Sequence, residues 1–344
     1  MSKTFLVGIS PDFYTDAKGR FEQALESKLQ GVLAFEAMPP QPDNTARAED
    51  LDRYDAIFSL GMKYTADSLR GLKRLAVIAR WGVGYDMIDI PAATASDVLI
   101  AITPQAVKRP VAEAALAYVF ALAKNMREQD QIVRAGKWRG QLSRLGTCMA
   151  DRVLGSVGLG NIGGEMFRLA AGLGFSRFLA CDPYADPAKA RALNVELVSM
   201  EDLFRQSDFL TVNCLLNEQT RGLITEGLLR LMKPTAFFIN TARGPIVDQK
   251  ALTKALQEKW ILGAGIDVFE QEPPDADDPL LQLENVLLAP HALAWTEEIA
   301  RDNGLEACDN ILTIARGEVP ASSAVNRDVL ARPGFQSKLE RYRS

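Results

Sequence analysis

Short apolar runs alternate with segments of helical spacing through the middle of the chain. Segments between the runs, such as residues 248–260, repeat their apolar positions with the period of a helix. Parallel strands need crossover connections, which are normally helical and right-handed. The pattern therefore predicts a parallel sheet covered by helices on both faces. The predicted strands are residues 153–157, 178–181, 209–213, 236–240, 262–267 and 286–289.

A glycine-rich turn follows the first of these strands and opens a predicted helix over residues 161–173. The turn reads Gly158-Leu159-Gly160-Asn161-Ile162-Gly163. The first glycine permits a tight turn, the second lets a pyrophosphate approach the backbone, and the third allows close helix packing. The N-terminus of the helix attracts the phosphate charge. The turn predicts a dinucleotide site, although the same glycines would also serve a plain chain reversal.

Asp182 ends the next predicted strand, about 20 residues beyond the glycine-rich turn, where a ribose-binding carboxylate is expected. A carboxylate there accepts hydrogen bonds from the ribose hydroxyls and repels a 2′-phosphate. No arginine follows within the turn to bind such a phosphate. We therefore predict NAD rather than NADP as the cofactor. The alternative is that Asp182 only caps the turn before Pro183.

Arg243, Glu272 and His291 each follow one of the last three predicted strands, and His291 is the only histidine of the chain. Because the carboxyl ends of parallel strands meet at one edge, we expect the three side chains to converge. A guanidinium grips carboxylate and carbonyl oxygens, and an imidazole paired with a carboxylate exchanges the proton of an alcohol. A lone histidine is more often a packing residue. Together with Arg243 and Glu272, however, His291 predicts hydride transfer on a 2-hydroxy or 2-oxo acid.

The composition is that of a globular protein, and the length of the chain indicates two domains. The chain has 344 residues, of which 47% are hydrophobic and 24% charged, with a net charge of −5. No basic stretch suits nucleic acid, and no apolar run reaches the roughly 20 residues of a membrane span. The apolar start of the chain is too short for a signal peptide, so we expect a cytoplasmic location. Scattered cysteines and one histidine predict neither a metal site nor a disulfide framework. The cysteines are Cys148, Cys181, Cys214 and Cys308.

Together these motifs resemble the D-isomer-specific 2-hydroxyacid dehydrogenase family over nearly the whole chain. Further matching segments are residues 80–89, 111–113, 240–244 and 263–273, and the pair Pro290-His291. The resemblance implies catalytic roles for Arg243, Glu272 and His291. It implies cofactor contacts for Gly158, Gly160, Asn161, Ile162, Gly163, Asp182, Thr241, Ala242 and Asp267.

The substrate pocket is less clearly encoded than the cofactor site. The resemblance implies that the Val83 and Gly84 amides hold the substrate carboxylate, and a Gly-Val-Gly turn after a predicted strand exposes successive amides suited to an anion. Lys63, Arg80 and Trp295 are further candidates for substrate contacts. Exposed lysines are usually solvated, however, and Trp295 and the neighbouring Trp81 would serve equally as packing residues.

The family architecture is interleaved: a Rossmann NAD-binding domain is inserted into a flavodoxin-like substrate domain. We expect the substrate domain over residues 1–102 and 297–344 and the Rossmann domain over residues 103–296. A hinge is predicted at 102–104, before a helix over 110–126. That helix and the arm 127–140, with Trp138, resemble a dimerisation region and predict a homodimer, unless Trp138 packs within its own subunit.

The sequence thus predicts an NAD-dependent D-2-hydroxyacid dehydrogenase in which His291 is the acid/base, Glu272 supports it and Arg243 binds substrate. Two alternatives stay open. Phosphite oxidation uses the same fold, whereas the formate-oxidising type carries glutamine where Glu272 stands. NAD-sensing corepressor proteins keep the catalytic residues but have long disordered tails, and here only residues 333–344 look loose.

Overall fold

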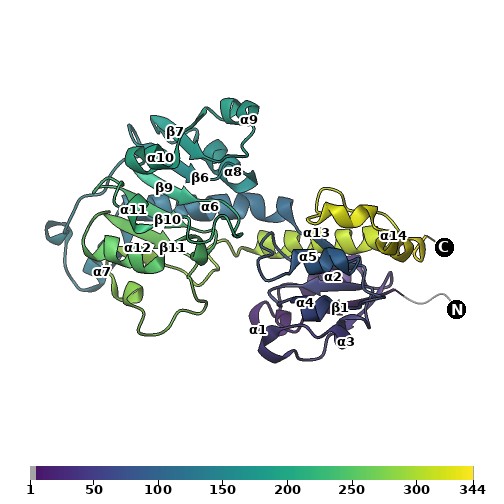
Figure 1. Ribbon diagram of the computed structural model, residues 1–344. Helices are drawn as coiled ribbons and strands as arrows, with labels where there is room; N and C mark the ends of the chain where they lie inside the picture. Colours follow the sequence, from purple (N-terminus) through teal and green to yellow (C-terminus); the bar gives the residue numbers. More distant parts are fainter. Residues whose placement is uncertain (1–4, 344) are drawn as a thin grey trace. The chain divides into compact units, whose positions relative to one another are not determined.

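The computed structural model describes residues 5–343 and divides into two compact units (Figure 1). The first unit combines the chain up to Val107 with the segment from Trp295 onward, and the second is Lys108–Ala294. The sequence-based boundaries lie after residues 102 and 296. The second unit is thus a continuous piece of chain, whereas the first is built from two pieces.

The first unit holds a five-stranded parallel sheet in the order β2-β1-β3-β4-β5. This is the strand order of flavodoxin-like folds, so the predicted fold of this domain is confirmed. The strands are β1 (Leu6–Ile9), β2 (Ala34–Ala37), β3 (Ala56–Ser59), β4 (Val77–Arg80) and β5 (Leu99–Ala101). The helices are α1 (Phe13–Asp16), α2 (Glu22–Lys28), α3 (Ala48–Leu51), α4 (Ala66–Leu69), α5 (Ile90–Ala95), α13 (Glu297–Ala315) and α14 (Pro333–Glu340), with short 3-10 turns at Pro42–Asn44 and Arg327–Ala331.

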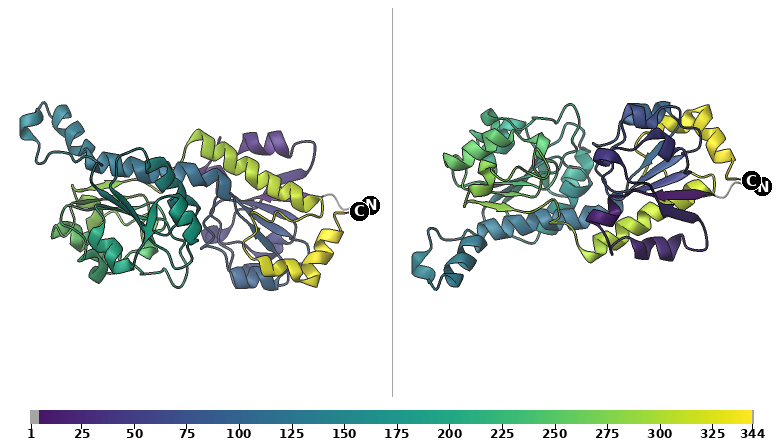
Figure 2. Two further views of the ribbon diagram at one scale, coloured as in Figure 1. Left: turned by 90° about the horizontal axis from the view of Figure 1, so that it is seen from above. Right: turned by 90° about the horizontal axis from the view of Figure 1, so that it is seen from below.

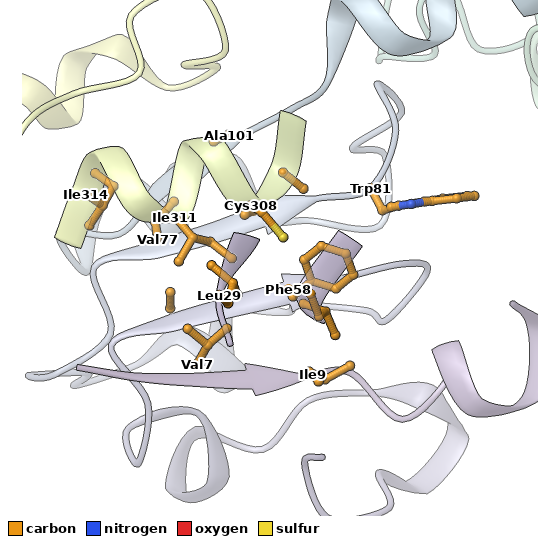
Figure 3. Packing of buried hydrophobic residues seen from close by; sticks show 14 of the residues in the cluster. Val7, Ile9, Leu29, Phe58, Val77, Trp81, Ala101, Cys308, Ile311 and Ile314 are labelled. Carbon is orange, nitrogen blue, oxygen red and sulfur yellow. The ribbon is translucent and has the colours of Figure 1, made fainter. Parts of the chain in front are cut away.

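Alternation along the strands of this sheet builds one hydrophobic core on each face. On one face, Cys308 and Ile311 of α13 pack toward Phe58 and Val77 of the sheet (Figure 3). On the other face, neighbouring strand residues such as Ile57 pack with α3, α4 and α5. The first face is therefore covered in large part by the returning C-terminal segment of the chain.

The expectation that residues 333–344 are loose is wrong for most of that segment. Pro333–Glu340 forms α14, and Phe335 and Leu339 are fully buried in the core of the first unit. These two residues are four positions apart, so they lie on one face of the helix. The residues between Phe335 and Leu339 are polar, so the sequence did not reveal this short amphipathic pattern.

The second unit holds a seven-stranded parallel sheet in the order β12-β11-β10-β9-β6-β7-β8. This doubly wound order, with β6 at the point of reversal, confirms the predicted Rossmann fold. The strands are β6 (Val153–Val157), β7 (Arg177–Cys181), β8 (Val195–Leu197), β9 (Phe209–Val212), β10 (Phe237–Asn240), β11 (Gly263–Ile266) and β12 (Val286–Leu288). Sequence patterning missed β8, an edge strand in which only Val195 is buried.

Helices cover both faces of this sheet, as expected from the crossover pattern. The helices of the second unit are α6 (Pro104–Ala123), which begins in the first unit, α7 (Met126–Arg134), α8 (Asn161–Ala170), α9 (Pro187–Ala192), α10 (Met200–Gln206), α11 (Glu226–Leu229) and α12 (Gln249–Gln257), with 3-10 turns at Arg139–Gln141, Gly244–Ile246 and Pro279–Gln282. Figure 2 shows α7 and the segment after it projecting from the rest of the second unit. Among the described residues, no helix combines the length and apolar character needed to cross a membrane.

Helix α6 begins at Pro104, six residues earlier than the sequence predicts. Proline suits the first position of a helix because its missing N–H would have no partner there. The Glu306 carboxylate then accepts hydrogen bonds from the Gln105 and Ala106 amides, at 3.5 and 3.0 Å. This long-range cap fixes the start of α6, and Pro110 is accommodated inside the helix.

Candidate active site

The glycine-rich loop joins β6 to α8 in a conformation that requires glycine at its start. Gly158 has a φ of 98°, which non-glycine residues rarely adopt, and its N–H donates to the Cys181 carbonyl at 2.9 Å. A Cβ at Gly158 would also lie 3.0 Å from the Asn213 backbone. At Gly160, by contrast, an added Cβ would meet no described atom within 4 Å. The loop therefore packs closely against the Asn213 backbone at Gly158, whereas Gly160 faces open space.

The Asp182 carboxylate ties this loop to the end of β7. One oxygen accepts the Leu159 N–H at 2.8 Å and the other accepts the Tyr184 N–H at 2.9 Å. The second bond is the turn-capping role that the sequence left open. A carboxylate oxygen accepts more than one hydrogen bond. Turn capping and ribose binding by Asp182 are therefore compatible.

Two buried polar atoms at the carboxyl edge of this sheet lack hydrogen-bond partners among the described residues. They are Thr241 Oγ1, just after β10, and Asn213 Oδ1, just after β9. The amide nitrogen of Asn213 donates to Ser156 and Thr211, at 2.9 Å each. Buried polar atoms are normally satisfied, so unpartnered atoms at this edge fit a polar ligand such as NAD.

His291 lies in the turn after β12 in a constrained backbone conformation. Its φ of 53° is left-handed, which is uncommon for a residue other than glycine. Its N–H donates to the Asp267 carbonyl at 2.7 Å, and its Nδ1 lies 2.7 Å from Glu272 Oε2. The side chains of His291 and Glu272 are 42% and 36% exposed. The ring is thus held on one side by a carboxylate and reaches solvent on the other.

The Asp267 side chain holds the backbone that follows His291. Its Oδ1 accepts the Ala292 and Leu293 N–H groups at 3.0 and 3.1 Å, and the residue is only 3% exposed. Burial raises the pKa of Asp267, while the two amides and the nearby His291 oppose that rise. Asp267 therefore fixes the backbone that follows His291.

The charges around Glu272 favour its anionic form. Burial raises the pKa of Glu272, but the hydrogen bond and charge of His291, the Phe269 amide and the Arg243 charge together hold it below its usual value. The Phe269 N–H donates to Glu272 Oε1 at 3.0 Å. Each carboxylate oxygen thus has a partner, and the side chain is fixed facing the imidazole.

Arg243 follows β10 and reaches the same edge of the sheet. Asn240 donates from Nδ2 to the Arg243 carbonyl at 3.0 Å, and Arg243 Nη1 donates to the Ala242 carbonyl at 2.7 Å. At Gly244, a Cβ would overlap the Phe269 carbonyl oxygen, 1.8 Å away. Because Gly244 has no Cβ, the turn after β10 can pack directly against the loop that carries Glu272. The second unit thus brings Arg243, Glu272 and His291 together.

The predicted carboxylate loop lies in the first unit, directly after β4. Gly82 has a φ of 131°, and its N–H donates to Thr103 Oγ1 at 2.8 Å. The Arg80 guanidinium is buried behind this loop and donates to the Gly84 carbonyl at 2.6 Å, to the Trp81 carbonyl at 2.9 Å and to the Leu60 carbonyl. These contacts join the turns after β3 and β4. They give Arg80 a loop-holding role, and a substrate contact stays a prediction.

The remaining substrate candidates differ in their surroundings. Lys63 is exposed, in the turn after β3. Trp81 is 4% exposed and packs edge-to-face on Phe13 and on Trp295, with ring centroids 6.1 and 5.8 Å apart. The Arg20 guanidinium lies 5.5 Å from the Trp295 ring. The two tryptophans thus form part of the aromatic core of the first unit.

Comparison with known proteins identifies the family. Residues 116–292 match the D-isomer specific 2-hydroxyacid dehydrogenase, NAD binding domain. The chain is also 40% identical over 306 residues to a glyoxylate reductase from Korarchaeum cryptofilum, which covers 88% of this chain and 91% of that protein. The chain belongs to the D-isomer-specific 2-hydroxyacid dehydrogenase family. It is an NAD-dependent oxidoreductase that interconverts 2-hydroxy and 2-oxo acids.

Other members agree over similar lengths. A glyoxylate reductase from Aeropyrum pernix is 36% identical over 326 residues, covering 92% of this chain and 96% of that one. Among solved structures, a glyoxylate reductase from Paecilomyes thermophila matches with a TM-score of 0.81 and 28% identity, covering 94% of this chain and 98% of that one. The similarity to family members therefore extends through both units of this dehydrogenase.

Sequence reasoning missed one supporting residue whose partner lies far away in the chain. Tyr118 of α6 donates its hydroxyl to the Ile266 carbonyl at 3.0 Å, directly before Asp267. A Cβ at Gly265 would lie 2.5 Å from the Tyr118 ring, so glycine is needed there. A glycine inside a buried strand was the available signal, because it often marks a close approach.

The Glu272 contacts generate a test that needs no substrate. In His291→Gln, the pKa of Glu272 is expected to rise, because burial remains while the hydrogen bond and charge of the imidazole are reduced or lost. Carbon-13 carboxyl titration of glutamate-labelled protein measures this, with Glu272→Gln assigning the resonance. Glu226, whose pKa is lowered mainly by its hydrogen bond to Arg230, is the internal control. An unchanged Glu272 titration would show that the pair is not coupled in solution.

Proposed function

We propose that this dehydrogenase reduces small 2-oxo acids of the glyoxylate type to D-2-hydroxy acids. The observation that carries the proposal is the His291–Glu272 pair, 2.7 Å apart, beside Arg243 at the nucleotide-binding edge of the second unit. The glyoxylate reductase names of several relatives support the choice of substrate class. Phosphite oxidation and a corepressor role receive no specific support from the site.

In this mechanism His291 is the general acid and Arg243 the electrophilic group. NADH supplies the hydride when bound. The protonated imidazole donates its proton to the substrate carbonyl oxygen, and the adjacent Glu272 carboxylate fixes the orientation of the ring. The Arg243 guanidinium stabilises negative charge as it develops on that oxygen. In the oxidation direction His291 takes the proton from the alcohol.

The other predicted contacts are part of the proposal. The Val83 and Gly84 amides bind the substrate carboxylate, and Lys63, Arg80 and Trp295 are further candidate contacts. For the cofactor, Gly158, Gly160, Asn161, Ile162 and Gly163 face the pyrophosphate, Asp182 binds the ribose, and Thr241, Ala242 and Asp267 lie near the nicotinamide. We also propose a cytoplasmic location, because the reaction draws on the NADH pool inside the cell.

A substrate screen tests the proposed reaction. Purified protein should consume NADH with glyoxylate or hydroxypyruvate in a panel that also holds phenylpyruvate, 2-oxoglutarate and phosphohydroxypyruvate, with phosphite and NAD assayed in parallel. Arg243→Ala is expected to lower kcat/KM by about 10²–10³, as the loss of an oxyanion partner does. His291→Ala should lower kcat by about 10²–10⁴.

NADH binding, read by its fluorescence, should stay nearly unchanged in His291→Ala, which separates chemistry from cofactor affinity. Near-normal turnover in that variant would remove His291 as the acid. Activity with phosphite alone would replace the 2-oxo acid proposal.

Cofactor choice has its own test at Asp182. Asp182→Ala removes the carboxylate that repels a 2′-phosphate, so the ratio of kcat/KM with NADPH to that with NADH should rise at least tenfold. Asp186→Ala is the matched control, because Asp186 lies in the same turn but caps α9 through the Ala188 amide at 2.8 Å. The assignment fails if both variants keep the wild-type cofactor ratio.

We further propose a homodimer formed through α7 and the arm that follows it. Trp138 is 67% exposed and Leu145 is 84% exposed, and Met126 and Val133 are each 56% exposed. Beside α7 lies a cavity of about 690 Å³ that extends to β12 and to the end of α12. Exposed apolar groups next to a groove are typical of protein interfaces.

Sedimentation velocity at micromolar concentration tests the dimer. The wild-type protein should sediment at about twice the chain mass of 37.7 kDa. A variant with Val133→Asp and Trp138→Ala should sediment as the single chain with unchanged circular dichroism. A wild-type protein that sediments as a single chain would contradict the proposal.

A further inference from the structure

A lysine on α9 contacts the glycine-rich loop from behind. Lys189 Nζ donates to the Leu159 carbonyl at 3.1 Å and to the Gly160 carbonyl at 2.7 Å. These are two consecutive carbonyls of the turn that leads into α8. No motif in the sequence singles out Lys189, which lies 29 residues beyond Gly160.

The two held carbonyls determine where the loop amides point. A peptide group is planar and trans, so its C=O and N–H point to opposite sides. The Leu159 carbonyl shares a peptide group with the Gly160 N–H, and the Gly160 carbonyl shares one with the Asn161 N–H. Because Lys189 holds both carbonyls, both N–H groups face away from its ammonium. Amides at the start of a helix have no partner within it and are suited to an anion.

Gly164 allows the lysine to cross α8 at this point. An added Cβ at Gly164 would lie 2.9 Å from Lys189 Cε and 3.2 Å from Nζ. Glycine inside a helix is less favourable than alanine, so its presence at a helical position calls for a packing reason. The path of the Lys189 side chain supplies that reason. Gly164 directly follows the last glycine of the nucleotide-binding motif.

The charges near Lys189 leave its ammonium available to the backbone. Lys189 makes no ion pair within 4.0 Å to any carboxylate in residues 5–343. Burial lowers the pKa of Lys189, nearby Lys108 lowers it further, and Asp182 and Asp186 oppose the change. Lys108 itself lies 3.7 Å from the Glu165 carboxylate. The carbonyl dipoles of the loop are thus the direct partners of this cation.

We propose that Lys189 is a positioning residue of the cofactor site: it holds the loop carbonyls so that the Gly160 and Asn161 amides stay turned toward the pyrophosphate of the dinucleotide. The inference rests on the NAD-dependent function of the family and adds a residue to it. The ammonium lies behind the loop, so it orients the amides and also adds positive charge behind the phosphates. It makes no contact with the reacting atoms.

Ligand fragments separate this role from a general loss of structure. Dissociation constants of NADH, ADP and adenosine are measured for the wild type and for Lys189→Met, which keeps the aliphatic stem. Lys189→Met is expected to weaken NADH and ADP binding about tenfold, the scale of one lost charge-assisted contact, and to leave adenosine within twofold. The difference arises because adenosine carries no phosphate.

Two further variants and a control complete the design. Lys189→Arg should restore most of the ADP affinity, because a guanidinium also donates to carbonyls. Gly164→Ala should weaken ADP binding in the same direction as Lys189→Met, because the methyl group displaces the lysine stem. Lys254→Met is the matched control, since Lys254 is a lysine of the same unit that contacts Glu226 instead of the loop.

The outcomes distinguish this inference from the proposed function. Wild-type ADP and NADH affinity in Lys189→Met, or equal losses for ADP and adenosine, would overturn the role of Lys189 while leaving the dehydrogenase proposal intact. A wild-type protein that does not bind NADH would overturn both.

Discussion

Three hydrogen bonds between Asp267 and the backbone from His291 to Leu293 hold the centre of the site together. The Asp267 carbonyl accepts the His291 N–H, and its carboxylate accepts the next two amides. A buried carboxylate is costly unless it is hydrogen-bonded, and these amides provide that compensation. The same bonds hold His291 in a left-handed conformation, for which a cost of about 1–3 kcal/mol is typical. Glu272 can orient the imidazole because the backbone that carries the His291 ring is fixed in this way.

The parts that the sequence predicted well depend on local rules. The strands of the Rossmann sheet were found, apart from the short edge strand β8, because buried parallel strands are continuous apolar runs. Arg243, Glu272 and His291 were placed at one edge because strand ends converge in a parallel sheet. The parts that were missed depend on partners far away in the chain. Helix α6 begins at Pro104 because Glu306 caps it, and Tyr118 reaches the backbone before Asp267 from a helix 148 residues earlier.

Cations that hold carbonyl oxygens recur in this protein. Lys189 does so behind the glycine-rich loop, and Arg80 behind the loop of Val83 and Gly84. Lys338 donates to the Leu75, Ser96 and Asp97 carbonyls, and burial lowers its pKa to about 8. A carbonyl oxygen accepts hydrogen bonds from a cation but, unlike a carboxylate, does not neutralise its charge. At Lys189, this arrangement leaves the glycine-rich loop positively polarised where an anionic ligand is proposed to bind.

The interleaved chain also imposes an order on assembly during synthesis. The second unit is a continuous segment, Lys108–Ala294, so all of its strands leave the ribosome before any residue of α13. The first sheet is made earlier, but Cys308, Ile311 and Ile314, which cover one of its faces, are made after both sheets (Figure 3). Because domains generally fold as units, the nucleotide-binding unit is complete while the first sheet still exposes apolar side chains such as Val77 and Phe58. Of the two sheets, the one that is translated first is therefore the one whose core is completed last.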